Sequence, residues 1–160
     1  MKIINEIINH PKYMDYYNQI LTLEKDRVFC KHDMTHFLDV ARIAYIKILE
    51  DQADISKEDI YIVSILHDIG RFEQYLNGEA HEKASTRLCV DILRDLNISE
   101  SKIVDYQTAI SNHRNKLIKD NKDLSGYLYR GDKASRPCHS CPQESNCSWD
   151  MAKKNMNINI

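Results

Sequence analysis

The stretch Leu66-His67-Asp68-Ile69-Gly70-Arg71 places a histidine and an aspartate side by side at the end of an apolar run, residues 60–66. An imidazole is a good ligand for a transition metal, and a carboxylate adds negative charge and can bridge two metals. Neither group is stable when it is buried without a partner. The pair therefore indicates either a metal site or an aspartate that only orients a histidine near a helix end, and the rest of the chain decides between them.

Apolar side chains recur at helical spacing on both sides of this pair, while only four glycines and three prolines interrupt the chain. Asp33 and Ser56 stand where N-caps are expected, and Gly70 is expected to end a helix that runs through Asp68. We expect polar connections at residues 74–79 and 116–123, and we see no strand or repeat. The predicted fold is all-α, an irregular bundle of six to eight helices covering roughly residues 2–9, 12–25, 33–49, 56–68, 79–96, 99–112 and 124–133.

The composition is that of one soluble globular domain, with 160 residues, 42% hydrophobic and 29% charged. A formal net charge of −2 argues against a dedicated nucleic-acid binder or a basic membrane-surface protein. The N-terminal residues lack the apolar segment of a signal peptide, and no apolar run is long enough to span a membrane. We therefore expect a cytoplasmic protein without a membrane partner, and a homodimer stays open.

Side chains of metal-ligand type stand near the ends of otherwise apolar helical segments: His36, His67, Asp68, His81, His113 and Asp132. Helix ends from different segments can converge on one pocket. Four histidines and two aspartates in such a pocket would have the ligand set of a one- or two-metal hydrolytic site.

The contexts His36-Phe37-Leu38-Asp39, Leu66-His67-Asp68-Ile69-Gly70-Arg71 and Gly131-Asp132-Lys133 resemble the HD-domain superfamily of metal-dependent phosphohydrolases, over about residues 30–135. The resemblance implies an all-helical fold and hydrolysis of phosphate esters, often of nucleotides. It assigns the four metal ligands of the motif to His36, His67, Asp68 and Asp132. His81 and His113 match the additional histidines of two-metal members, in which Asp68 would bridge. Arg114 stands where many of those members have a further histidine, so one ion and two ions both stay open.

Mixed imidazole and carboxylate ligation suits Mn, Fe, Co, Ni or Zn, and it also permits Mg. We expect Asp68, beside His67, to hold a water molecule and accept its proton. Arg71 and Lys133 are the cations most expected to neutralise a phosphate, with Lys83 and Arg114 as further candidates. The competing hypotheses are a regulatory module that binds a nucleotide or senses metal or redox state, and a hydrolase that acts on RNA, which the net charge disfavours.

A cysteine-rich tail, residues 136–160, follows the expected helical domain of residues 1–135 and is expected to pack on it. Cys138 and Cys141 are two residues apart, and Cys147 can fold back as a third ligand. Cys30 precedes His36 by six residues, as Cys138 follows Asp132 by six, so Cys30 is the best fourth ligand; His139 or His32 could substitute for it. Four such ligands would bind zinc or an iron–sulfur cluster. The alternative is a flexible extension with reduced thiols, and Cys89 is expected to be plain core.

Overall fold

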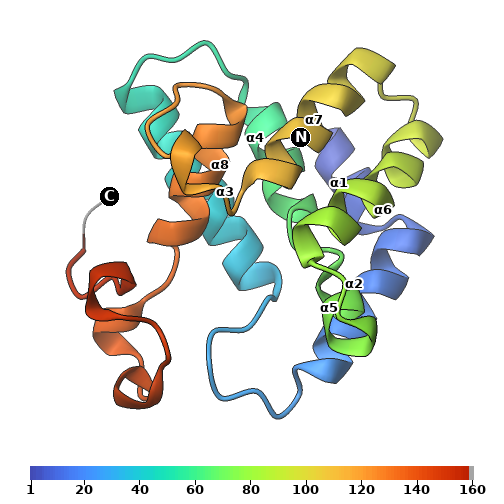
Figure 1. Cartoon of the computed structure of the whole chain (residues 1–160). Helices are drawn as coiled ribbons and strands as arrows, with labels where there is room; N and C mark the ends of the chain where they lie inside the picture. Colours follow the sequence, from blue (N-terminus) through green and yellow to red (C-terminus); the bar gives the residue numbers. More distant parts are fainter. Residues whose placement is uncertain (159–160) are drawn as a thin grey trace.

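The computed structural model describes residues 1–158, and that part of the chain is helical throughout, without a strand. This confirms the predicted all-α bundle. The α-helices, shown in Figure 1, are α1 (Lys2–Ile8), α2 (Pro11–Leu23), α3 (Met34–Glu50), α4 (Lys57–Leu66), α5 (Arg71–Asn77), α6 (His81–Asp95), α7 (Glu100–Asn112) and α8 (Leu124–Ala134). The short 3-10 turns are η1 (Lys116–Ile118), η2 (Cys138–Ser140), η3 (Glu144–Asn146) and η4 (Met151–Lys153).

Side-chain caps start the helices that carry or position the site. Asp33 accepts a hydrogen bond from the backbone N–H of His36, and Ser56 accepts one from Asp59. Asp123 caps α8 in the same way by accepting from Gly126. Each cap satisfies a backbone donor that the first turn of a helix leaves without a partner, so it fixes where the helix begins.

The expectation that one helix runs through Asp68 and stops at Gly70 is wrong. α4 ends at Leu66, and residues 67–70 form a turn in which the Arg71 N–H donates to the Asp68 carbonyl. Gly70 has an ordinary φ of −86° and precedes α5, which covers much of the segment expected to be a polar connection. The turn contains no left-handed residue, and Gly78, with φ of +81°, ends α5 instead.

α3 and α8 cross at very close range in the middle of the bundle (Figure 1). A Cβ added to Gly131 would lie 2.7 Å from the Val40 carbonyl oxygen and 2.8 Å from the Ala44 Cβ. The absence of a side chain at Gly131 thus allows the two backbones to approach. This contact brings Asp132 of α8 near His36 of α3, although the two residues are far apart in the sequence.

The bundle encloses one apolar core, in which Tyr13, Phe37 and Tyr127 are among the largest fully buried side chains. After α8 the chain continues through η2, η3 and η4 beside the loop that joins α2 to α3 (Figure 1). The cysteine-rich tail was expected to reach residue 160, and its last two residues lie outside the described part. None of the described helices is long and apolar enough to cross a membrane.

Candidate metal centre

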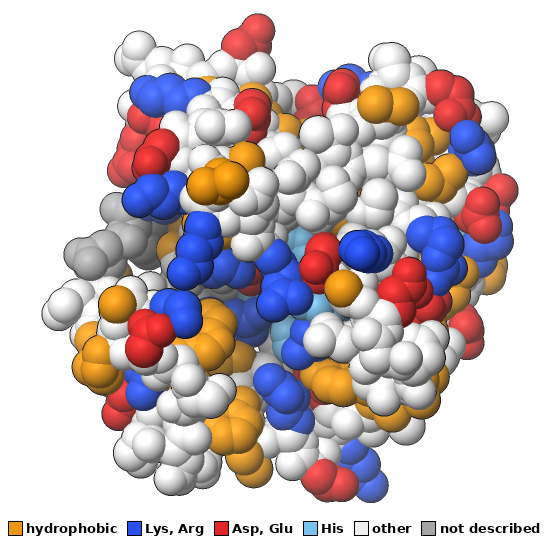
Figure 2. Space-filling view, viewed as in Figure 1, with side chains coloured by type: hydrophobic (Ala, Val, Ile, Leu, Met, Phe, Trp, Pro, Cys, Tyr) orange, Lys and Arg blue, Asp and Glu red, His pale blue; other side chains and the backbone are white. Residues whose placement is uncertain are grey.

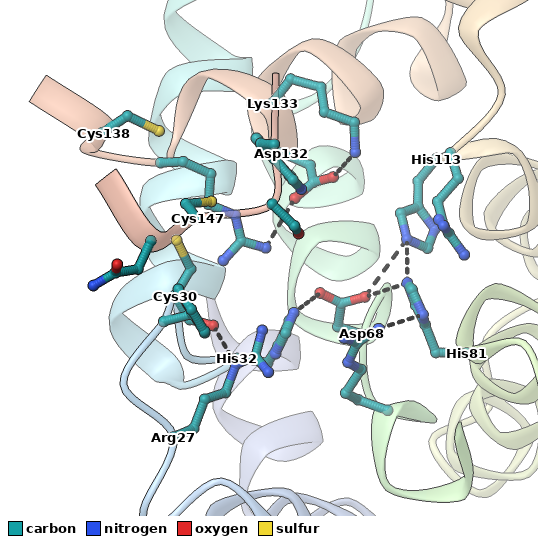
Figure 3. A pocket seen from close by; sticks show the side chains of 17 residues that line it. Arg27, Cys30, His32, Asp68, His81, His113, Asp132, Lys133, Cys138 and Cys147 are labelled. Atoms are coloured by element: carbon teal, nitrogen blue, oxygen red, sulfur yellow. Dashed lines mark hydrogen bonds and ion pairs between the residues drawn. The ribbon is translucent and has the colours of Figure 1, made fainter. Parts of the chain in front are cut away.

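Five separate segments bring the six expected ligands to the floor of one cleft, where all six are buried. His36 lies in the first turn of α3, and His67 and Asp68 lie in the turn after α4. The other three are His81 at the start of α6, His113 just after α7, and Asp132 near the end of α8. Figure 3 shows Asp68, His81, His113 and Asp132 around a common space.

The ligand atoms fall into two groups of three with Asp68 between them. One group is His36, His67 and Asp132; the other is Asp68, His81 and His113, and within each group the atoms lie within 4.8 Å of one another. Asp68 Oδ2 lies 3.1 Å from His67 Nε2 and 3.6 Å from His36 Nε2. Asp68 Oδ1 lies 3.2 Å from His81 Nε2 and 3.5 Å from His113 Nε2. The two oxygens of one carboxylate thus face the two groups separately.

Hydrogen bonds orient all four imidazoles with Nε2 toward the centre. The Nδ1–H groups of His67 and His113 donate to the carbonyl oxygens three residues earlier, Ser64 and Ile110, at 2.7 Å in both cases. His36 Nδ1 lies 3.1 Å from Ser135 Oγ, whose own proton goes to the Asp132 carbonyl oxygen.

The same assignment holds at His81, where Nδ1–H donates to Gln74 Oε1 at 2.6 Å. Arg71 donates to the same oxygen, so the short distance between its guanidinium and the imidazole reflects two donors sharing one acceptor. These outer partners fix the tautomers and leave each Nε2 lone pair available, as in histidines that bind metals.

Two buried polar atoms at the centre have no hydrogen-bond partner among the described residues: His67 Nε2 and Asp68 Oδ1. Leaving such an atom unsatisfied costs about 1–3 kcal/mol, and more for a charged group. A divalent cation in each group of ligand atoms would satisfy them. The donor set of four imidazoles and two carboxylates therefore fits one or two transition-metal ions.

The protonation states also suit metal binding. Burial lowers the pKa of His36 to about 4 and that of His81 to about 3, so both imidazoles are neutral near pH 7. Burial also works to raise the pKa of Asp68, but interactions with His67 and with the other imidazoles around it hold the pKa well below its usual range. Burial would likewise raise the pKa of Asp132, but the positive charges of Lys133 and Arg136 outweigh burial and keep this pKa low. Both aspartates are thus ionised.

The cleft above the metal ligands has a cavity volume of about 560 Å³, and basic side chains line it. Figure 2 shows Lys and Arg side chains gathered around the hollow, with histidine visible inside it. Of the expected cations, Arg71, Arg114 and Lys133 line the cleft, and Lys133 pairs with Asp132. Lys83 is exposed on a different surface, beside Thr86 and Arg87.

Arg136 was missed by the sequence reasoning, which assigned it to the tail. Its side chain is buried, and Nη2 lies 3.1 Å from His36 Nε2 and 3.5 Å from Asp132 Oδ1. A guanidinium can only donate, so His36 Nε2 accepts and must carry a lone pair. The signal in the sequence was its position four residues after Asp132, one helical turn along the same face.

A second missed feature is a buried pair formed by Glu24 and His32. The Glu24 carboxylate accepts from His32 Nδ1, from the His32 backbone N–H and from the Tyr75 hydroxyl. His32 Nε2 then faces the cleft, 3.8 Å from Asp68 Oδ2. His32 was considered only as a substitute ligand for the cysteine site, and no helical pattern marks the loop that carries it.

No disulfide joins the five cysteines in the described part of the chain. Cys30, Cys138 and Cys147 line the same cleft, on the side away from His81 and His113 (Figure 3), whereas Cys141 is half-buried beside it. Among the described residues, only the two groups around Asp68 have three ligand atoms within 4.8 Å of one another, and neither contains a cysteine. Cys89 is fully buried in the core on α6.

Comparisons with known proteins agree with this geometry. The sequence model described as "HD domain" matches residues 34–139, which include all six ligands of the centre. An uncharacterised protein of Clostridium beijerinckii is 41% identical over 158 residues, a span that covers 99% of each chain. No solved structure gives a significant match. Since the family match covers more than half of the chain, this protein belongs to the HD domain family, a superfamily of metal-dependent phosphohydrolases.

Proposed function

We propose that this chain hydrolyses a nucleotide or another small phosphate ester at the His/Asp centre. The observation that carries the proposal is the shared position of Asp68, which presents one oxygen to each group of ligand atoms beneath a cleft lined with cations. A volume of about 560 Å³ is in the range of small-molecule sites. The positive charge of the five basic residues that line the cleft complements a polyanionic ligand; they are Arg27, Arg71, Arg114, Lys133 and Arg136.

His36, His67 and Asp132 would hold one ion, His81 and His113 a second, and Asp68 would contribute to both. A divalent ion supplies a lowered pKa for water and polarises a phosphoryl oxygen. The second group is a complete set of three ligands without a histidine at position 114. We therefore favour two ions over one.

The chain's own side chains have distinct tasks in the reaction. Asp68 orients the attacking water and accepts its proton, while Lys133 and Arg71 neutralise charge that develops on the phosphoryl oxygens. His32, which Glu24 orients, faces the same space and is placed to protonate the leaving oxygen. Asp132 lies beside His36 at the base of the cleft, and Arg136 is close enough to both to neutralise charge on a bound phosphate.

The test is turnover of a panel of nucleotides and of mono- and bis-para-nitrophenyl phosphates, with added Mn, Co, Ni, Zn or Mg. We expect metal-dependent release of phosphate or nitrophenol. Asp68→Asn should lose metal at both groups and His67→Ala at the first, and both variants should lose turnover. Asp120→Asn is the matched control, because Asp120 has an 88% exposed side chain outside the cleft and should keep both metal and turnover.

The alternative of a binding module predicts a different result. Metal-loaded protein that binds a nucleotide tightly but turns over no ester in the panel would overturn the enzyme proposal. Full turnover in His67→Ala or Asp68→Asn would overturn the site instead, because both side chains belong to the proposed ligand set.

A further inference from the structure

We propose that Cys30, Cys138, Cys141 and Cys147 together bind an iron–sulfur cluster at the edge of the cleft. The four thiols come from two segments far apart in the sequence, the loop between α2 and α3 and the tail after α8. Cys30, Cys138 and Cys147 line one cavity, and Figure 3 shows their sulfur atoms on the same side of it. Four cysteine ligands are the usual set for a [4Fe–4S] cluster.

The local fold of the tail places the fourth cysteine, Cys141, one turn after Cys138. η2 begins at Cys138, and the Cys141 N–H donates to the Cys138 carbonyl oxygen, which closes one turn of 3-10 helix. Side chains three residues apart in a 3-10 turn lie over one another. Cys141 is therefore on the same side of the turn as Cys138, although it does not line the cleft itself.

The tail also places a cation beside these thiols. Lys154 Nζ donates to the Glu144 carbonyl at 2.8 Å and to its carboxylate at 2.7 Å, and its side chain is only 7% exposed. The hydrogen bond to Glu144 raises the pKa of Lys154, so its side chain stays a cation. A buried ammonium near the sulfurs would offset part of the negative charge of four thiolates.

A cluster and a zinc ion require different separations of the four sulfurs. Tetrahedral zinc with Zn–S bonds of about 2.3 Å holds its sulfurs about 3.8 Å apart. Among the described residues, no three cysteine sulfurs lie within 4.8 Å of one another, although Cys30, Cys138 and Cys147 line one cleft. A cluster puts several iron atoms between the thiolates, so it needs this wider separation.

Such a centre would also join two segments that otherwise share no polar contact. Among the described residues, no hydrogen bond or ion pair connects residues 24–33 with residues 137–158. Residues 24–33 carry His32 and Arg27, and the tail continues from Arg136, so both segments form walls of the cleft. The cluster would hold these walls together.

The experiment is analysis of iron, zinc and acid-labile sulfide in the full chain, purified without oxygen and reconstituted with iron and sulfide. We expect about four sulfides per chain and a broad visible absorbance that bleaches in air. Iron alone is not decisive, because the His/Asp centre can also bind it; sulfide reports the cluster. Cys30→Ser and Cys141→Ser, one from each segment, should both lose the sulfide and the absorbance.

Two controls separate this centre from the rest of the protein. Cys89→Ala changes a buried cysteine outside the site, and His67→Ala removes a ligand of the other centre; both should keep the sulfide. Far-ultraviolet circular dichroism checks that the serine variants are folded. If Cys141→Ser unfolds, loss or retention of sulfide in Cys30→Ser, which lies in the loop, still tests the proposal.

Three results would overturn the proposal. Reconstituted wild-type protein that holds no sulfide would exclude the cluster, as would sulfide that Cys30→Ser and Cys141→Ser both retain. One zinc per chain in place of sulfide, lost in the same two variants, would show that the thiols bind zinc instead.

Discussion

Substitution of Arg136 should affect metal binding and turnover in opposite directions. In the described structure its guanidinium contacts His36 Nε2 and Asp132 Oδ1, which are two of the expected ligand atoms. We expect Arg136→Met to bind Mn²⁺ or Co²⁺ more tightly, because a competing cation is removed. The same change should lower kcat/KM by about 10²- to 10³-fold, since a charge that stabilises the transferring phosphate is lost.

Calorimetric titration of metal and steady-state kinetics on the best phosphate ester measure the two effects. Arg94→Met is the matched control, because Arg94 is exposed and pairs with Glu100 outside the cleft. A parallel fall of metal affinity and kcat/KM in Arg136→Met would contradict the competition and show that Arg136 supports the ligands.

Glu24 makes a pH-dependent contribution to stability through its hydrogen bonds to His32 and Tyr75. Burial alone would raise the pKa of Glu24, but the bond to His32 outweighs burial and lowers it from 4.5 to about 2. A carboxyl with a depressed folded-state pKa stabilises the fold above its unfolded pKa, and this stability is lost as the pH falls toward 2. We expect Glu24→Gln to cost about 2–3 kcal/mol at pH 6 and progressively less below pH 4.5. Urea unfolding at several pH values measures this loss of stability, and Glu50→Gln, at an exposed position, is the control. A stability difference between Glu24→Gln and the wild type that does not change with pH would contradict the ionic role of Glu24.

At the scale of the elements, the sequence predicted the long helices well because their boundaries are local. Asp33 and Ser56 cap α3 and α4 with their own side chains, which neighbouring residues suffice to indicate. The turn at residues 67–70 and the helix α5 were not predicted, because they depend on a distant contact. The Gly70 N–H donates to Ser85 Oγ of α6 at 2.9 Å, and no pattern near Gly70 announces that partner.

Gly70 offers a direct test of this packing. A Cβ at position 70 would lie 2.4 Å from the Ser85 backbone nitrogen and 2.6 Å from the Ala84 Cβ, so α5 and α6 must move apart. We expect Gly70→Ala to destabilise the protein by about 1–3 kcal/mol and to weaken metal binding, because Asp68 and His81 flank the contact. Gly78→Ala is the comparison: no atom lies within 4 Å, and only its φ of +81° opposes a side chain. Gly78→Ala should lower the free energy of unfolding by about 1 kcal/mol in chemical denaturation and keep its metal affinity. An equal loss of metal affinity in Gly70→Ala and Gly78→Ala would contradict the steric explanation.

The six ligands could be predicted from the sequence because each stands in a short context of its own, such as His67-Asp68 before Ile69-Gly70-Arg71. Their neighbours in space could not. Arg136 meets His36 across 100 residues, and Glu24 meets Tyr75 across 51. Such pairs depend on how α3 crosses α8 and how α2 packs on α5, which the helical pattern of each segment does not specify.

For the molecule as a whole, the centre links elements from most of the bundle. Its ligands come from α3, α6 and α8 and from the residues that follow α4 and α7. Since the unfolded chain does not hold these residues together, metal binds the folded state almost exclusively and stabilises it by mass action. A free metal concentration of 100 times Kd would add about 2.7 kcal/mol.

We therefore expect removal of metal with EDTA to lower Tm by about 5–10 °C, given about 2–4 °C per kcal/mol for a chain of this size. Differential scanning calorimetry with and without re-added Mn²⁺ measures the shift, and metal analysis confirms that EDTA has emptied the site. His67→Ala should show a smaller shift than the wild type, because it lacks a ligand of the first group and keeps the three ligands of the second. Complete metal loss without a change in the wild-type Tm would contradict this prediction. It would show that the described residues hold the centre together without a cation, through core packing such as that of α3 against α8.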